Sequence, residues 1–498
     1  SFRNIVMRPN FQVLSPETIP RIIEEALELL QSPGVKVGSP QALDLLQSSG
    51  GIVNQQEGVV SIPEELALQA LESVPRDFSL FNLNGEPGVR YSGDIVHFNP
   101  GSSGVNILDS DSLEHRPSQS KDLVNIIKIA ENLPVYDAQS TAVICHDVPE
   151  EIGDFYRLYL VLLLSEKPII TGSFSTGTSG IMFELLKIDR GDAENLGEKP
   201  RAVFDVCPSP PLNWTNFASQ NLIDLARENI PAQIVSMPLT GAASPVTLIG
   251  SIVQHAAECL SGITIHQLAN PGAPIVWGGA PALFDMRSGT TSVGAVETTL
   301  IVCGYAQVAK SLGLPTHAYL GATDAKLVDA QAGMESAAST NFGVLSGINM
   351  ISGAGMLDFL ACQSLEKLVI DAEVIANSKR FLKGVDQTAE TLALAHYEDF
   401  KFPGNFLKHK LTRQLYREEF YLPSQIIDRG SLREWKENRK PDTFLRAKSH
   451  VDELLANYQP PEMDAKKTQE MSRLVSSYAR KAGMEQLPKI KLDGDNYI

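Results

Sequence analysis

Short apolar runs alternate with longer amphipathic stretches along residues 94–380. Residues 151–165 are typical of the longer stretches, because Phe155, Leu158 and Leu162 recur at the spacing that places side chains on one helical face. The shorter runs have the length of buried strands, and a turn separates each from the next amphipathic stretch. The pattern predicts strands at 94–99, 135–145, 168–174, 201–206, 232–237, 273–278, 315–320 and 348–353, and helices at 120–133, 151–165, 177–188, 217–229, 246–268, 291–312, 327–345 and 358–380.

Eight strands that are each followed by a helix predict an α/β fold, a (β/α)8 TIM barrel that forms the catalytic domain over residues 86–385. A doubly wound open sheet is the alternative architecture. No G-x-G-x-x-G motif follows the first predicted strand, so the sequence does not support a dinucleotide site of that fold. We therefore expect the barrel.

The two ends of the chain differ from this pattern. Residues 1–85 contain three short amphipathic helices with a proline at or near each start, which predict an N-terminal helical cap packed on the barrel. Residues 386–498 are rich in charged and aromatic side chains, and helical patterns recur near 450–457 and 464–483. We expect this C-terminal helical extension to contact another subunit of a homo-oligomer.

Composition narrows the classes of function. The chain has 59 acidic and 42 basic residues and a formal charge of −17, which argues against a nucleic-acid partner. It has no run of about 18 uninterrupted apolar residues and no signal-peptide pattern, so we expect no membrane segment. Five widely spaced cysteines without a C-x-x-C pair indicate reduced thiols in a cytoplasmic protein. They are Cys145, Cys207, Cys259, Cys303 and Cys362.

Three apolar runs, PIVWGG, PTHAYLG and INMISGAG, each lead into a glycine-rich turn between residues 273 and 358. In a parallel α/β fold the carboxyl ends of the strands form the ligand site. The residues at all the predicted strand ends are rich in aromatic rings, methionine and carboxylate and poor in Lys and Arg, which favours a cationic ligand such as a quaternary ammonium. Each single Phe or Met is also compatible with ordinary core. The candidates are Phe98, Asn99, Phe174, Asp205, Trp277, His317 and Tyr319, with Asp324 in a following loop.

A resident metal ion is not expected. Cys145 and His146 form the nearest group of ligands, but adjacent residues on a strand point to opposite faces. A catalytic zinc needs three convergent ligands, and only the distant Cys207 or His317 completes such a set. A zinc-dependent enzyme stays as an alternative.

The chain resembles the trimethylamine methyltransferase (MttB) superfamily from its N-terminal helices to about residue 385. The order and spacing of several short motifs together carry the resemblance. They are PEELALQALESVPRDFSLF (63–81), HFNPG with NILD (97–109), HRPS (115–118), HDVPEE (146–151), KPIITGSFS (167–175), GGAPALFDMRSG (278–289), GATDAKLVDAQAGMES (321–336) and ISGAGMLDF (351–359).

This resemblance implies a (β/α)8 barrel that moves a methyl group from an amine to the cobalt of a corrinoid (cobalamin) held by a separate partner protein. The founding trimethylamine enzymes carry pyrrolysine, whereas this sequence has only standard residues. It is therefore similar to the non-pyrrolysine branch, whose members demethylate quaternary amines such as glycine betaine, proline betaine and carnitine. Glycine betaine, giving dimethylglycine, is the expected substrate.

The resemblance and the strand-end residues together suggest roles. The rings of Phe98, Phe174, Trp277 and Tyr319 are expected around the ammonium group, with Asp205 or Asp324 balancing its charge. Asn99, Arg287 and His317 are expected near the substrate carboxylate, and His317, Tyr319 and Asp324 are expected to orient the substrate. No residue is assigned to covalent catalysis. Glycine-rich strand ends are expected to leave room for the corrinoid, at Gly278, Gly279, Gly321, Gly353 and Gly355.

A function of another class stays open from the sequence. A protein that binds betaine or docks a corrinoid protein without turnover needs the same residues, because the expected transfer uses no diagnostic nucleophile or base.

Overall fold

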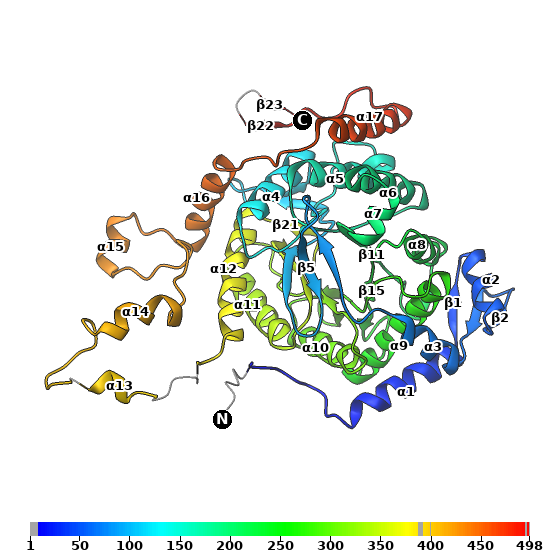
Figure 1. The fold of residues 1–498 in the computed structure, drawn as a ribbon, viewed down its shortest axis with the longest axis horizontal. Coiled ribbons are helices and arrows are strands. Elements are labelled where there is room, and N and C mark those ends of the chain that lie inside the picture. Colours follow the sequence, from blue (N-terminus) through cyan, green and yellow to red (C-terminus); the bar gives the residue numbers. More distant parts are fainter. Residues whose placement is uncertain (1–7, 387–391, 399, 494–495, 498) are drawn as a thin grey trace.

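A computed structural model describes residues 8–386, 392–398, 400–493 and 496–497. Its centre consists of parallel strands surrounded by helices (Figure 1). The strands form two sheets, of order β15-β13-β11-β10-β9 and β18-β19-β6, and every neighbouring pair is parallel. All eight overlap the predicted strands. They are β6 (His97–Pro100), β9 (Gln139–Ser140), β10 (Ile169–Gly172), β11 (Ala202–Val206), β13 (Ala232–Ile234), β15 (Ile275–Val276), β18 (His317–Ala318) and β19 (Met350–Ala354).

Backbone contacts link the two sheets at both edges. Trp277, directly after β15, forms a parallel bridge with Thr316, directly before β18. At the other edge, the N–H groups of Asp137 and Ala138, directly before β9, donate to the carbonyl of Phe98 in β6 at 2.8 and 3.2 Å. The eight strands therefore lie side by side in their order along the chain.

A helix follows each of these strands before the next one begins. Four of the eight begin later than predicted, those predicted from 246 and from 327 by two and three residues and two others by five and seven. One prediction begins at 291, where a short strand, β17 (Thr290–Ser292), precedes the helix. The other begins at 358, where Asp358, Phe359 and Leu360 have φ between 50° and 74°, a left-handed conformation that an α-helix cannot include. The helices are α4 (Ser120–Asn132), α5 (Glu150–Leu164), α6 (Thr176–Arg190), α8 (Asn216–Arg227), α9 (Leu248–Ala269), α10 (Val296–Ser311), α11 (Ala330–Leu345) and α12 (Leu365–Leu382), with a short α7 (Ala193–Glu198) after α6.

The apolar core has two parts. The larger part lies between the strands and the surrounding helices. The smaller part fills the interior of the strand set, where Ile170, Val203 and Met350 meet Leu80 and Tyr91 of a hairpin. This hairpin, β4 (Phe78–Phe81) and β5 (Pro87–Tyr91), lies across the centre of the strands in Figure 1. It bonds to backbone groups just before β10 and β11, so it covers the amino ends of the strands and leaves the carboxyl ends open.

Helix α9 is long and apolar enough to span a membrane by length and composition. Of its most apolar window, 83% is buried inside the molecule, as in the core helix of a globular protein.

The N-terminal region contains strands as well as the predicted helices. Helices α1 (Thr18–Gln31), α2 (Pro40–Ser48) and α3 (Glu64–Ser73) all pack on α9. Between them, β1 (Val35–Val37), β2 (Ile52–Asn54) and β3 (Val59–Ser61) form a small sheet, and β1 also pairs with β12 (Asn213–Trp214). The predicted boundary at residue 85 falls in the turn of the β4–β5 hairpin.

The C-terminal region divides into a packed part and an extended part. Helix α16 (Thr443–Ala456) packs on α12 and α4, and α17 (Ala465–Lys481) packs on α5 and α6. Helices α13 (Leu394–Tyr397), α14 (Lys410–Glu419) and α15 (Leu432–Glu437) contain no buried residue, and they lie apart from the main body in Figure 1. A short pair, β22 (Lys491–Asp493) and β23 (Asn496–Tyr497), ends the described chain.

Candidate active site

Alternation along two strands brings a carboxylate and a phenol to the interior of the strand set. Val203 of β11 belongs to the interior core, so Asp205, two residues later, faces the same way. His317 of β18 pairs with the interior Met350, and Tyr319 follows His317 by two residues. The Tyr319 hydroxyl donates a hydrogen bond of 2.9 Å to Asp205 Oδ2. Both side chains lie at the carboxyl ends of their strands and are partly exposed.

Asp205 has no positively charged partner in the part of the chain that the structure describes. Its Oδ1 accepts a hydrogen bond of 2.7 Å from Gln233 Nε2, and among the described residues no ion pair includes it. Burial raises the pKa of Asp205 to about 7, against the opposing effect of the hydrogen bonds from Gln233 and Tyr319. Burial and the neighbouring carboxylate raise the pKa of Tyr319, so its hydroxyl stays protonated and donates. The pair is therefore mainly anionic above pH 7, and a bound cation would stabilise that form.

A line of hydrogen bonds connects this pair to the hairpin at the other end of the strands. The buried Tyr91 hydroxyl of β5 donates to Gln233 Oε1 at 3.2 Å, and the same amide donates to Asp205. Gln233 lies in the middle of β13 with its amide oriented by both partners. The hairpin that covers the amino ends of the strands thus helps to orient Asp205 through Gln233.

A second polar cluster lies beside the first. His317 Nε2 is 3.1 Å from Ser352 Oγ, and this hydroxyl donates to Asn99 Oδ1 at 2.5 Å. Burial lowers the pKa of His317 to about 3, so the imidazole is neutral at physiological pH. The rings of His317 and Tyr319 meet edge to face with centroids 5.1 Å apart. Asn99 Oδ1 and His317 Nε2 are therefore engaged by protein groups, whereas the buried His317 Nδ1 has no hydrogen-bond partner among the described residues.

Phe98 and Trp277 lie outside this interior. Val276 belongs to the interior core, so the adjacent Trp277 points outward, where its ring lies 6.1 Å from that of His255 on α9. Phe98 is in the same outer core, and Lys379 Nζ of α12 lies 5.4 Å from its ring. Phe98 and Trp277, two of the four residues predicted for the cage, are each 1% exposed.

Phe174 is placed at the open end. It follows β10, in which Gly172 pairs with Asp205 of β11 and presents no side chain there. The Phe174 ring is 63% exposed, and the Arg157 guanidinium lies 5.4 Å from it. Its backbone N–H donates to Asp154 at 2.7 Å, which holds this loop against α5.

Arg287 and Asp324 have local partners. The Arg287 side chain is 92% exposed, in the turn between β16 (Ala282–Asp285) and β17, and it pairs with Asp285 at 3.1 Å. Asp324 accepts hydrogen bonds from the N–H groups of Val293 and Gly294 at 2.8 and 3.1 Å. Asp324 thus fixes the loop that enters α10, and neither residue is brought to the Asp205–Tyr319 pair by these contacts.

The five glycines predicted to face the corrinoid are all buried. A Cβ at Gly278 would lie 2.8 Å from Nδ1 of His317, so glycine lets the backbone pack against that ring. Gly321 and Gly355 have φ of 85° and 82°, which favours glycine. In these positions the protein itself occupies the space beside the backbone. The others, Gly279 and Gly353, also lie close to backbone carbonyls, of Ser236 and Leu320.

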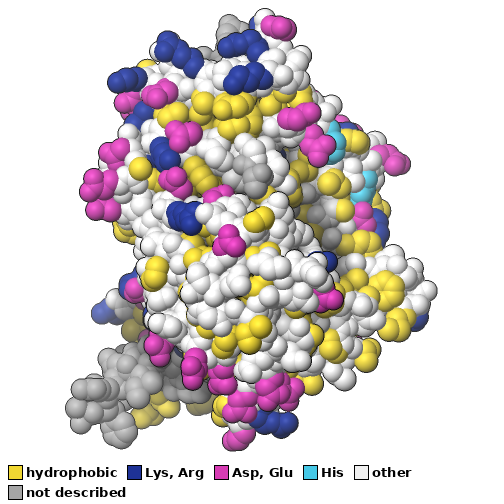
Figure 2. All heavy atoms as spheres, turned by 90° about the vertical axis from the view of Figure 1, so that its right-hand side faces the viewer, with side chains coloured by type: hydrophobic (Ala, Val, Ile, Leu, Met, Phe, Trp, Pro, Cys, Tyr) yellow, Lys and Arg dark blue, Asp and Glu magenta, His cyan; other side chains and the backbone are white. Residues whose placement is uncertain are grey.

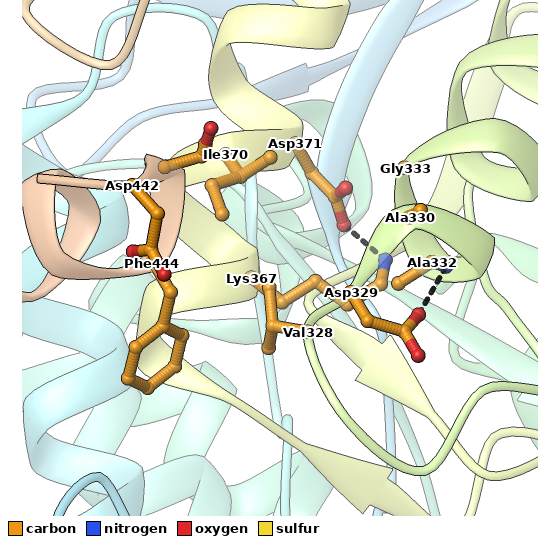
Figure 3. A pocket seen from close by; sticks show the side chains of 11 residues that line it. Val328, Asp329, Ala330, Ala332, Gly333, Lys367, Ile370, Asp371, Asp442 and Phe444 are labelled. Atoms are coloured by element: carbon orange, nitrogen blue, oxygen red, sulfur yellow. Dashed lines mark hydrogen bonds and ion pairs between the residues drawn. The ribbon is translucent and has the colours of Figure 1, made fainter.

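A buried ion pair supports the loop after β18. Lys367 Nζ on α12 bonds to Asp371 at 2.6 Å, to Ser336 Oγ at 2.8 Å and to the carbonyl of Gly321 at 3.0 Å. The pair lines a cavity of about 380 Å³ between α11, α12 and the start of α16 (Figure 3). The ion pair thus links α12, on which the C-terminal helix α16 packs, to the loop that follows Tyr319.

The described residues include no group of three or more His, Cys, Asp or Glu side chains able to hold a metal ion. All five cysteines are free thiols. Burial raises the pKa of the Cys145 thiol to about 12, which disfavours the thiolate form that binds metals.

Sequence reasoning assigned no role to three residues of the interior network, Tyr91, Gln233 and Ser352, although Ser352 lies within the strand end 350–353 that it expected to face the site. Gln233 interrupts an otherwise apolar strand, and a polar residue at an inward position of such a strand is the signal that identifies it. Ser352 carries a similar signal in β19. Tyr91 had none, because it belongs to a hairpin outside the repeated pattern.

Comparison with known proteins places the chain in a family. A family profile described as trimethylamine methyltransferase (MTTB) matches residues 1–484. The chain belongs to this family. It is 32% identical over 454 residues to the trimethylamine methyltransferase MttB of Methanosarcina barkeri, covering 90% of this chain and 91% of that protein. It is 29% identical over 452 residues, 91% of each chain, to the MttB of Desulfitobacterium hafniense strain DCB-2. It is 28% identical over 479 residues to a glycine betaine methyltransferase of D. hafniense strain Y51, covering 96% and 99%.

The fold of this family member also resembles a solved structure. The monomethylamine methyltransferase MtmB of M. barkeri superposes with a TM-score of 0.50 over 91% of this chain and 90% of that one, at 12% identity. The family assignment makes the chain a methyltransferase of the MttB type.

Proposed function

We propose that this chain transfers a methyl group from a quaternary amine to the cobalt of a corrinoid protein, with glycine betaine as the first candidate substrate. The observation that carries the proposal is the carboxylate of Asp205, held by Tyr319 and Gln233 at the open end of the strands without a positive partner. A quaternary ammonium has no N–H to donate, so charge and aromatic contact are what recognise it. Tyr319 supplies a ring beside the carboxylate, and the exposed ring of Phe174 lies at the neighbouring strand end.

The electron pair of the N–C bond that breaks makes a positively charged amine the better methyl donor. When a methyl group leaves a quaternary ammonium, the electron pair of the broken N–C bond stays on nitrogen and gives a neutral tertiary amine. The corrinoid supplies a cobalt(I) nucleophile and retains the methyl group. Because no proton moves, the protein has to orient one N-methyl group and exclude water. The chain has only standard residues, and its interior network contains no cation that would compete with the substrate.

Asp205 is expected to act on binding more than on the chemical step. Positive charge decreases on nitrogen as the methyl group leaves, so the carboxylate stabilises the substrate at least as well as the transition state. Its replacement should therefore raise KM more than it lowers kcat.

We propose further that the two sheets close into a (β/α)8 barrel and that the corrinoid protein docks over its open mouth. Large apolar side chains that follow strands or begin helices at this end are exposed: Phe174, Met237, Val246, Met286, Val296 and Leu327. Two of them are neighbours, since Met286 and Val246 both lie within 3.8 Å of a Cβ built on Gly241. Such a surface suits a protein partner. The free thiols are consistent with a reaction in the cytoplasm.

The test is anaerobic methyl transfer from a panel of amines. Purified protein is mixed with cob(I)alamin, then with corrinoid protein, and methylcobalamin formation is followed in the visible spectrum with glycine betaine, proline betaine, carnitine, choline and trimethylamine. We expect transfer from glycine betaine or another quaternary amine and none from trimethylamine. Asp205→Asn should raise KM, and Asp285→Asn, a carboxylate at the same end that already pairs with Arg287, is the matched control.

Two results would contradict the proposal. Transfer from trimethylamine alone would exclude a quaternary donor. Tight binding of a betaine without transfer, even with corrinoid protein, would favour the non-catalytic binding protein.

A further inference from the structure

The segment between α12 and α16 leaves the main body and returns to it. We call residues 392–398 and 400–422 the arm. Figure 1 shows α13 and α14 beyond α12, away from the ring of helices. The arm is held where it returns: the Tyr421 hydroxyl and the Ser424 hydroxyl each donate to Glu373 of α12 at 2.6 Å. Arg380 of the same helix also donates to the carbonyl of Glu419 at 2.9 Å.

Several large apolar side chains of the arm are exposed to solvent. Phe402 is 92% exposed, Leu407 is 81% exposed and Leu394 is 75% exposed. Several of its rings contact one another, such as Phe400 and Phe406 with centroids 5.4 Å apart, yet no residue of α13 or α14 is buried. Apolar side chains gathered in one exposed segment indicate a surface that another molecule covers.

The arm also has a charge opposite to that of the rest of the chain. The arm has five basic residues, Lys401, Lys408, Lys410, Arg413 and Arg417, and three acidic ones, Glu398, Glu418 and Glu419, so its net charge is +2, whereas the whole chain has a formal charge of −17. A basic aromatic segment on an acidic protein is complementary to the surface of a second copy of the same protein.

A complementary surface lies on α1. Glu24, Glu25 and Glu28 are exposed on this helix, and they line a cavity of about 640 Å³ together with one basic residue, Arg21, and with apolar side chains that include Leu29. The three carboxylates outnumber the one cation there. Figure 2 looks onto the side of the molecule that carries α1 and α2, and Asp and Glu side chains predominate over Lys and Arg at its lower edge. In Figure 1 the arm and α1 lie on different sides of the molecule.

We propose that the arm docks on a second copy of this chain, with its basic aromatic face against the acidic α1 surface of that copy. The partner is a second copy because the same molecule supplies both complementary surfaces and holds them apart. This contact joins different patches of the two copies and is therefore able to build a closed assembly. The inference is independent of the methyl-transfer proposal, since neither surface includes a residue of the Asp205 site.

The test is a charge exchange in the full chain. One variant, Lys408→Glu/Lys410→Glu/Arg413→Glu, reverses the arm, and another, Glu24→Lys/Glu25→Lys/Glu28→Lys, reverses α1. Sedimentation velocity and light scattering should show that the native chain is oligomeric and that each variant alone has a lower mass. A mixture of the two variants should recover an assembly, because the reversed arm of one meets the reversed α1 of the other.

Two further variants separate this contact from general charge effects. Lys121→Glu/Lys199→Glu/Lys466→Glu makes the same change in net charge at exposed positions elsewhere and should leave the mass of the assembly unchanged. Phe402→Ser/Leu407→Ser should weaken the assembly by about tenfold or more without changing charge. Circular dichroism confirms that each variant is folded.

Several outcomes would overturn the inference. A native chain that is monomeric at all concentrations would do so, as would an arm reversal that leaves the mass unchanged. Failure of the mixed variants to reassemble would exclude α1 as the partner surface. Binding of a monomeric native chain through the arm to RNA or to anionic vesicles would assign the arm to a different class of partner.

Discussion

An ionised carboxyl group that leaves water loses hydration, and Asp205 recovers only part of that loss from the hydrogen bonds of Gln233 and Tyr319. Its pKa of about 7, compared with an ordinary value of 3.8, records the difference. Because the folded-state pKa is raised, ionisation of Asp205 destabilises the fold increasingly as pH rises from 3.8 toward 7. A bound cation would offset this cost, and in the proposed function that cation is a quaternary amine.

The affinity for glycine betaine should therefore depend on pH. Above pH 7 Asp205 is ionised and attracts the ammonium group, whereas below pH 7 a proton competes with the ligand. We expect the dissociation constant to rise by up to about tenfold per pH unit below 7, until the lower pKa of the complex is reached. Calorimetric titration between about pH 5.5 and 8.5 measures this dependence.

Asp205→Asn provides the control for that titration. It should bind glycine betaine about tenfold or more weakly at pH 8 and show little change with pH. The same substitution should also raise the melting temperature above that of the native chain, and by more at pH 8 than at pH 5, since the destabilising charge is gone. A pH dependence that survives in the Asn variant would assign the titration to another group.

The alternation of side chains between the two faces of a strand decides which predicted residues face the interior of the strand set. Phe98 and Asn99 were both predicted to bind substrate, yet adjacent residues face opposite sides, so Asn99 is interior and Phe98 is in the outer core. Trp277 is turned outward for the same reason, next to the interior Val276. The sequence identified the strand ends correctly, but it lacked the register that distinguishes the two faces.

At the scale of elements, α12 supports the loop that carries the site. Lys367 and Asp371 are one helical turn apart and both are buried, and Lys367 also binds the carbonyl of Gly321, two residues after Tyr319. Burial lowers the pKa of Lys367 and raises that of Asp371, and each charge opposes the shift of the other. Each buried charge therefore depends on the other for its stabilisation.

Lys367→Met should destabilise the fold by about 3–5 kcal/mol at neutral pH, because Asp371 is left buried and unpaired. Chemical denaturation measures this loss, and Lys367→Met/Asp371→Leu should recover part of it. The exposed pair of Arg433 and Glu437 has the same spacing, so Arg433→Met is the matched control and should leave the unfolding midpoint unchanged. Equal losses in the single and double variants would show that the ion pair is not the cause.

Helix and strand positions were the most predictable feature of this chain. Local signals fix them, as where Ser39 caps α2 through the N–H of Ala42 and proline occupies the next position. The two largest exceptions have different causes. The strand β17 pairs with β16 in a local hairpin, which replaces the predicted start of a helix. Residues 358–360 turn left-handed before β21 (Cys362–Gln363) pairs with the distant β7 (Asn106–Leu108).

At the scale of the whole molecule, the order of eight strands followed from counting repeated units, whereas the covering of their amino ends did not. The β4–β5 hairpin has no place in the repeat, and its role depends on packing against Ile170, Val203 and Met350 of three distant strands. It nevertheless contributes Tyr91, which begins the line of hydrogen bonds that ends at Asp205. The closed end of the strands is thereby connected to the open one.

Tyr91→Phe and Tyr319→Phe should separate stability from ligand binding along this line. Tyr91→Phe leaves Gln233 Oε1 without its donor, which should cost about 1–3 kcal/mol of stability, while Gln233 Nε2 still reaches Asp205. Tyr319→Phe removes a donor from the carboxylate itself, so the pKa of Asp205 should rise and betaine binding should weaken at pH 7. Denaturation and calorimetric titration of both variants measure the two effects. If Tyr91→Phe also shifts the midpoint of pH-dependent binding, the hairpin sets the charge of the site as well as its stability.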